Sequence, residues 1–69
     1  MNWTTYSEKT TDDAELGEMC QLGSYNRYDV FKDSLGKWVV AHNDFTLKSG
    51  LESKQAAKSF ANMHRIENA

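Results

Sequence analysis

Few side chains in this 69-residue chain have the types and spacing that catalysis or metal binding requires. The two histidines, His42 and His64, are far apart in the sequence, and Cys20 is the single cysteine. A nucleophile needs a base within hydrogen-bond reach, and structural zinc is held by ligands at paired spacings. Neither pattern is present. The sequence therefore predicts no enzyme, no metal site and no cofactor, with Cys20 as a small buried hydrophobe.

Acidic residues concentrate near the start of the chain. The first 22 residues hold five acidic side chains and one lysine, a net charge of −4, whereas residues 23–69 carry +2. Carboxylates grouped in this way can occupy sites on a partner that are meant for phosphates. Ordinary solubilising charge is the alternative explanation. The candidate partner-binding residues are Asp12, Asp13, Glu15 and Glu18.

A second candidate surface lies within residues 25–48, where aromatic and basic residues interleave. Aromatic rings and cations together are typical of nucleic-acid binding. Asp29 and Asp33 interrupt the basic surface, and the whole chain has a net charge of −2. This surface is therefore the alternative to the acidic segment. Its candidate contacts are Tyr25, Arg27, Tyr28, Lys32, Lys37 and Lys48.

The elements that position these residues can be predicted from residue patterns. Residues 25–32 and 37–42 alternate aromatic or β-branched residues with polar ones, which predicts a hairpin closed by a turn ending at Gly36. Residues 45–48 predict a third strand, and residues 2–6 can add a short fourth strand or arm. An amphipathic helix over residues 53–65, with Ser53 as N-cap, completes the pattern. Ser49 followed by Glu52 offers an alternative start for this helix.

The segment 12–22 has a helical pattern. Leu16, Met19 and Cys20 follow the i, i+3, i+4 spacing, and Gly23 is typical of a helix end. Asp12 and Asp13 would then lie in the first turn, where negative charge favours the helix. The sequence thus predicts a short acidic N-terminal helix.

Together these elements predict one α+β domain spanning residues 1–69. A small antiparallel sheet of three strands, or four with residues 2–6, packs against the C-terminal helix, and the short acidic helix lies at the edge of the sheet or over it. The predicted core contains Val30, Trp38, Val40, Phe45, Leu47, Ala57 and Phe60, joined by Leu16 and Met19 from the first helix.

Length and composition limit the remaining possibilities. A chain this short buries only about 60% of its unfolded surface, so it needs a good aromatic core or oligomerisation, and a homodimer stays open. The start of the chain lacks the basic and apolar regions of a signal peptide, and no stretch approaches the length of a membrane span. With a lone thiol, these features predict a cytoplasmic location without membrane association.

The hairpin and helix also carry a resemblance. Residues 28–31, 36–40 and 52–57 resemble small bacterial and phage ββ(β)α domains, in which a tyrosine-x-valine, glycine-x-tryptophan-x-valine hairpin precedes an S/T-K-x-x-A helix. One such group is the arm-binding domains of phage integrases, whose sheet enters the DNA major groove. In size and style the chain resembles small phage inhibitors, anti-CRISPR proteins among them.

The sequence thus leads to two hypotheses about function. The first is a non-catalytic protein-binding module, such as a phage or mobile-element inhibitor that uses its acidic segment as a phosphate mimic against a host nucleic-acid-handling complex. The second, implied by the integrase resemblance and the basic surplus of residues 23–69, is a small DNA- or RNA-binding domain that uses the aromatic–basic hairpin.

Overall fold

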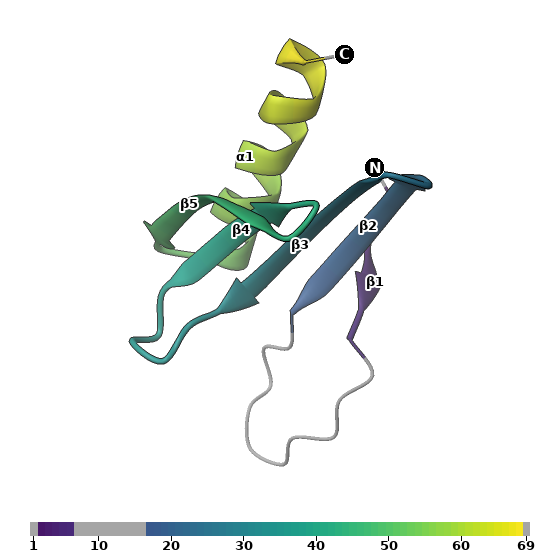
Figure 1. Ribbon diagram of the computed structural model, residues 1–69. Coiled ribbons are helices and arrows are strands. Elements are labelled where there is room, and N and C mark those ends of the chain that lie inside the picture. Colours follow the sequence, from purple (N-terminus) through teal and green to yellow (C-terminus); the bar gives the residue numbers. More distant parts are fainter. Residues whose placement is uncertain (1, 7–16, 69) are drawn as a thin grey trace.

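The computed structural model describes residues 2–6 and 17–68, which form an antiparallel sheet and one helix (Figure 1). The sheet has five strands in the order in which they occur in the chain, each paired antiparallel with the next. The elements are β1 (Thr4–Thr5), β2 (Glu18–Gly23), β3 (Asn26–Lys32), β4 (Trp38–His42), β5 (Phe45–Leu51) and α1 (Lys54–Glu67). The α+β class is confirmed, and the number of strands exceeds the prediction.

Local turn chemistry fixes the register of the central strands. Asn43 and Asp44, between β4 and β5, have φ angles of 50° and 70°, as in a two-residue type I′ hairpin loop. The Asn43 side chain accepts a hydrogen bond from the Arg27 backbone N–H and donates one to the Tyr25 carbonyl. Two neighbouring loops are thereby tied together at one end of the sheet.

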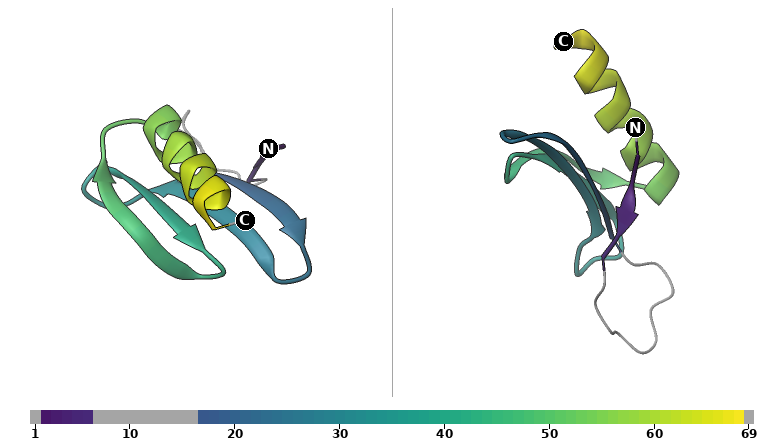
Figure 2. Two further views of the ribbon diagram at one scale, coloured as in Figure 1. Left: turned by 90° about the horizontal axis from the view of Figure 1, so that it is seen from above. Right: turned by 90° about the vertical axis from the view of Figure 1, so that its right-hand side faces the viewer.

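Helix α1 begins where the sequence predicts. The Ser53 hydroxyl accepts a hydrogen bond from the Ala56 N–H, which makes Ser53 the N-cap. The helix lies on one face of the sheet, and among the described residues no second helix covers the opposite face (Figure 2). Ala57 and Ala61 are buried where it meets β3 and β4, because their small side chains allow a close approach.

The core lies between α1 and the central strands. It contains Tyr28, Val30, Trp38, Val40, Ala57 and Ala61, with Trp3, Leu47, Leu51 and Phe60 packed against it. Four of the predicted core residues are fully buried, and Leu47 and Phe60 are partly buried. Phe45 was predicted wrongly: its side chain is 76% exposed, because α1 packs mainly over β3 and β4 and leaves the start of β5 open.

The predicted N-terminal helix is wrong where the structure can be compared with it. Residues 18–23 form the strand β2, which pairs with β3 from Glu18↔Val30 to Gly23↔Asn26. Glu18 and Cys20 point toward the helix side and are buried, as the two-residue period of a strand requires. Residues 12–16, including Leu16, lie outside the described residues. Within the described ranges, no helix has the length and apolar character needed to cross a membrane.

Candidate partner-binding surface

The sheet face opposite α1 carries a cluster of polar and apolar side chains. Arg27, Asp29 and Phe31 alternate along β3 with the core residues Tyr28 and Val30, so they point away from the helix. Val39 and Ala41 of β4 pair directly with Phe31 and Asp29, and therefore share this face. We call this side of the sheet, which α1 does not cover, the open face. Asp29, Val39 and Ala41 on it are nevertheless buried.

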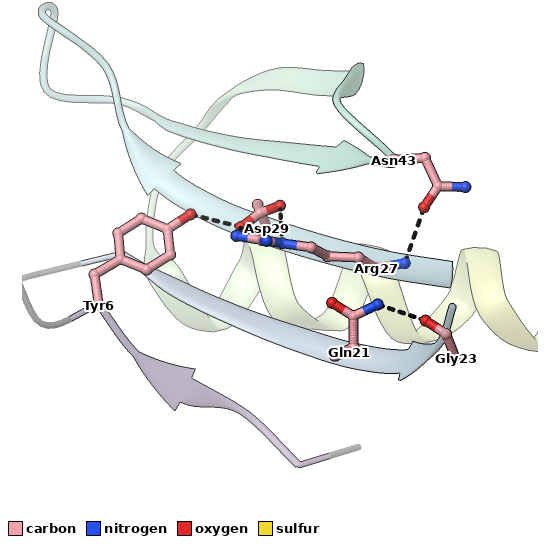
Figure 3. Close-up of polar contacts among 6 residues, drawn as sticks. All are labelled: Tyr6, Gln21, Gly23, Arg27, Asp29 and Asn43. Atoms are coloured by element: carbon pink, nitrogen blue, oxygen red, sulfur yellow. Dashed lines mark hydrogen bonds and ion pairs between the residues drawn. The ribbon is translucent and has the colours of Figure 1, made fainter. Parts of the chain in front are cut away.

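An ion pair organises the centre of the open face (Figure 3). The Arg27 Nε lies 3.0 Å from Asp29 Oδ2, and Arg27 Nη2 lies 3.0 Å from Asp29 Oδ1. Tyr6, next to β1, donates its hydroxyl hydrogen to Asp29 Oδ1 over 2.8 Å. Asp29 is only 7% exposed, so these donors compensate for the burial of its charge. The bidentate geometry holds the guanidinium in one orientation.

Both hydrogen-bond donors to the Asp29 carboxylate, Tyr6 and Arg27, have raised pKa values. Burial raises the pKa of the Tyr6 hydroxyl, and its hydrogen bond to the Asp29 carboxylate raises it further. The hydrogen bond to Asp29 likewise raises the pKa of Arg27. Tyr6 therefore stays a neutral donor and Arg27 a cation at any physiological pH.

A shallow cavity of about 320 Å³ lies beside this ion pair. Phe31 and Ala41 supply apolar walls, and Thr46 supplies a hydroxyl from β5. The hydrogen bonds to Asp29 use Nε and Nη2 of Arg27, which leaves Nη1 without a hydrogen-bond acceptor among residues 2–6 and 17–68. The full lining is Tyr6, Arg27, Asp29, Phe31, Ala41, Asp44 and Thr46.

The predicted acidic site is only partly within the structure. Asp12, Asp13 and Glu15 lie outside the described residues. Glu18 is buried on the helix side of β2, where Lys54 Nζ lies 3.0 Å from Oε2 and Lys58 Nζ lies 2.6 Å from Oε1. Burial by itself raises the pKa of Glu18, but the hydrogen bonds and charges of Lys58 and Lys54 outweigh it, so the pKa lies below its ordinary value. Glu18 thus links α1 to the sheet.

Replacing Glu18 with glutamine is expected to lower the free energy of unfolding by about 1 kcal/mol at neutral pH. The folded pKa lies below the ordinary value of 4.5, so the carboxylate stabilises the fold above that pH. This contribution is lost as the pH falls through the folded pKa. Urea denaturation of both proteins from neutral to strongly acidic pH should show their difference shrinking toward zero.

Glu67→Gln is the matched control for this measurement. Glu67 is exposed at the end of α1 and makes no ion pair with any other described residue, so its substitution should change stability little at any pH. A Glu18→Gln penalty that stayed constant down to strongly acidic pH would show that the two lysine contacts do not stabilise the fold through charge.

The residues of the predicted aromatic–basic surface do not form one face. Tyr28 is buried in the core, and Tyr25 is 90% exposed at the β2–β3 turn. Lys37 is paired with Glu52 at 3.0 Å. The remaining cations are dispersed: Arg27 holds Asp29 on the open face, Lys32 lies 5.7 Å over the Trp38 ring, and Lys48 lies on the edge strand β5.

Both histidines lie beside Tyr28, at the end of the sheet near the last turns of α1. The Tyr28 ring stacks on His42 with 4.4 Å between centroids, and its hydroxyl lies 2.7 Å from His64 Nδ1. His42 Nε2 lies 2.9 Å from Asn26 Oδ1. Across the described part of the chain, no three metal-ligating side chains gather into a group. Cys20 is buried, as predicted, but on a strand rather than a helix.

The alternation of residues 25–32 puts Arg27, Asp29 and Phe31 on one side of a strand, but it does not by itself identify their cluster as a site. The signal was present in their alternation, whereas the contribution of Tyr6 depends on the β1–β2 pairing and has no local signature. Comparison of the chain with protein-family models, with curated proteins and with solved structures gives no match.

Proposed function

We propose that the chain is a non-catalytic module that binds a protein partner through the open face. The observation that carries this proposal is the Arg27 guanidinium, held by Asp29 beside the cavity, whose Nη1 has no acceptor in the described part of the chain. A partner side chain can lie along Phe31 and Ala41 and place an acceptor oxygen at Nη1. The ion pair pre-organises Arg27, which lowers the entropy that binding would otherwise cost.

The composition of the open face favours protein over nucleic acid. Arginine and tyrosine are enriched among the residues that dominate protein–protein binding energy. The cavity lining on this face places the carboxylates of Asp29 and Asp44 beside Arg27, the one cation that the described residues contribute to it, an arrangement that repels phosphate. The other cations of the hairpin are dispersed, so the continuous basic surface that nucleic-acid binding needs is not supported.

The acidic segment can add a second contact to the same partner. Because Glu18 is engaged by two lysines, phosphate mimicry would rest on Asp12, Asp13 and Glu15. In that case the partner is a complex that handles nucleic acid, and the module acts as a small inhibitor of it. Binding of a partner through the open face does not require this phosphate mimicry.

Filling the cavity is expected to abolish partner binding without unfolding the domain. Thr46→Arg places a long charged side chain in the cavity from an exposed position on β5. Ser34→Arg adds the same side chain at the exposed β3–β4 turn, outside the cavity. Affinity capture from a host lysate, quantified by mass spectrometry, should show partners that wild type and Ser34→Arg retain and Thr46→Arg loses.

Two results would contradict binding of a protein partner through the open face. Capture of the same proteins at the same level by wild type and Thr46→Arg, with both variants folded by circular dichroism, would remove the open face as the binding surface. Low-salt binding to duplex DNA that weakens steeply with added salt would favour the nucleic-acid alternative instead.

A further inference from the structure

Besides the open face, the described residues form a groove between β5 and α1. Helix α1 packs mainly over β3 and β4, so the helix side of β5 is left largely open (Figure 2). A cavity of about 380 Å³ lies there. Met63 is 57% exposed, and Phe45, which pairs with His42 and so shares the helix side, is 76% exposed. The groove is lined by Leu51, Ala56, Ser59, Phe60, Met63, His64 and Glu67.

Beside this groove, β5 is an edge strand. Among residues 2–6 and 17–68 it pairs only with β4, so no described strand uses its outer backbone N–H and C=O groups, and another strand can pair there. It spans seven residues, contains no proline and carries Lys48 as its single charge. Register shifts opposite Val40 bend the strand, so pairing at the edge is expected to be short. The groove must then supply the rest of any contact.

The charges around this surface bear on which partner can occupy it. Lys48 on β5 and Glu67 at the end of the groove have opposite signs, and neither contacts another described side chain of opposite charge. The lysines of the first half of α1 are directed elsewhere, since Lys54 and Lys58 both bind Glu18. The surface is thus apolar and electrically balanced. A strongly charged partner would therefore gain no electrostatic attraction at this surface. A second copy of the chain presents the same apolar and electrically balanced surface, and the two copies are compatible.

We infer that this surface binds a second copy of the chain, with the two β5 strands paired antiparallel about a two-fold axis. An axis perpendicular to the sheet keeps both helices on the same side, so each groove faces the other copy's Phe45 and Met63. Such an isologous contact is the commonest in homodimers. A standard interface takes about 800 Å² from each partner, roughly a sixth of the 4804 Å² surface of one chain. The contact also covers apolar surface that a chain of this size cannot bury alone.

Analytical ultracentrifugation of the purified chain tests this inference without any other partner. Over about 1 to 500 µM, wild type is expected to shift from monomer to dimer. Phe45→Glu and Met63→Glu, both at exposed positions, should each weaken dimerisation at least about tenfold. Leu35→Glu is the matched control, because Leu35 is 83% exposed in the β3–β4 turn and lies outside the groove. It should leave the dimer intact.

Hydrogen exchange then distinguishes edge pairing from other contacts. Outward-facing amides of β5 should be protected at dimer-forming concentrations in wild type and in Leu35→Glu, but not in Phe45→Glu. A chain that stays monomeric over the whole range overturns the inference. So does a dimer that Phe45→Glu leaves unchanged, that Leu35→Glu weakens equally, or in which these amides exchange freely. The open-face proposal is tested separately, because the Thr46 side chain pairs with Ala41 on the open face, on the opposite side of β5 from the groove.

Discussion

Truncating Trp38 to alanine is expected to unfold the domain. Trp38 is 2% exposed and lies in the core between β4 and α1, where Lys54 Nζ also approaches its ring at 5.6 Å. Removing a buried tryptophan costs about 3–5 kcal/mol. Single domains are stable by about 5–15 kcal/mol, and one this small lies at the lower end. Far-ultraviolet circular dichroism during heating should therefore show no cooperative transition for Trp38→Ala.

Two variants make this measurement specific. Trp38→Phe keeps an aromatic ring in the core and should retain a cooperative transition at a lower melting temperature. Leu35→Ala removes an 83% exposed side chain and should change stability by less than about 0.5 kcal/mol. A cooperative Trp38→Ala transition near the wild-type temperature would show that the core is organised differently from the packing described above.

The central hairpin and the helix could be predicted because local pattern and tertiary packing agree there. Val30, Trp38 and Val40 occupy inward positions of alternating strands, and Ser53 is a strong N-cap beside an alanine-rich stripe. In these segments the residues that favour the element are also the residues that the core needs.

The segment that became β2 could not be predicted in the same way. Glu18, Met19 and Cys20 fit helical spacing as well as strand alternation over so short a run. Pairing with β3 decides between them, since it buries Cys20 opposite Tyr28 and brings Glu18 to Lys54 and Lys58. These partners are distant in sequence, so local propensity had no access to them.

The candidate surface could be predicted only in part, because its contacts combine local alternation with partners that are distant in sequence. Alternation places Arg27, Asp29 and Phe31 together on β3, and that can be seen in the sequence. The sequence alone suggests that Arg27 contacts phosphate. In the structure Asp29, which also accepts a hydrogen bond from Tyr6, binds Arg27 and holds it as a donor of fixed orientation. Tyr28 shows the opposite case: its aromatic ring looked available to nucleic acid, yet it packs in the core against His42 and His64.

Gly17→Ala is expected to destabilise the domain by about 1–3 kcal/mol, the usual cost of overpacking. Gly17 is buried immediately before β2, and its carbonyl accepts a hydrogen bond from the Tyr6 N–H at 2.9 Å. A Cβ at this position would lie 2.6 Å from Tyr6 Cε2 and 2.7 Å from the Val30 carbonyl oxygen. Both distances are far below van der Waals contact, so something must move.

Neither neighbour of Gly17 can move without loss. The Val30 carbonyl belongs to the backbone of a central strand, and Val30 itself is fully buried. The Tyr6 ring can turn aside only by giving up its hydroxyl contact with Asp29, which leaves a buried carboxylate with Arg27 alone. Gly17→Ala should therefore disturb the Tyr6–Asp29–Arg27 cluster of the open face as well as lower the stability of the fold.

Gly23→Ala, at the far end of β2, provides the matched control. A Cβ at Gly23 meets nothing within 4 Å, and its φ is not in the left-handed region. The substitution should be neutral or slightly stabilising, because alanine restricts the unfolded chain more than glycine does. Urea denaturation of the two variants gives the comparison directly. Equal stability of Gly17→Ala and Gly23→Ala would mean that Tyr6 does not pack over Gly17, and the Tyr6–Asp29–Arg27 cluster would lose its anchor to β1.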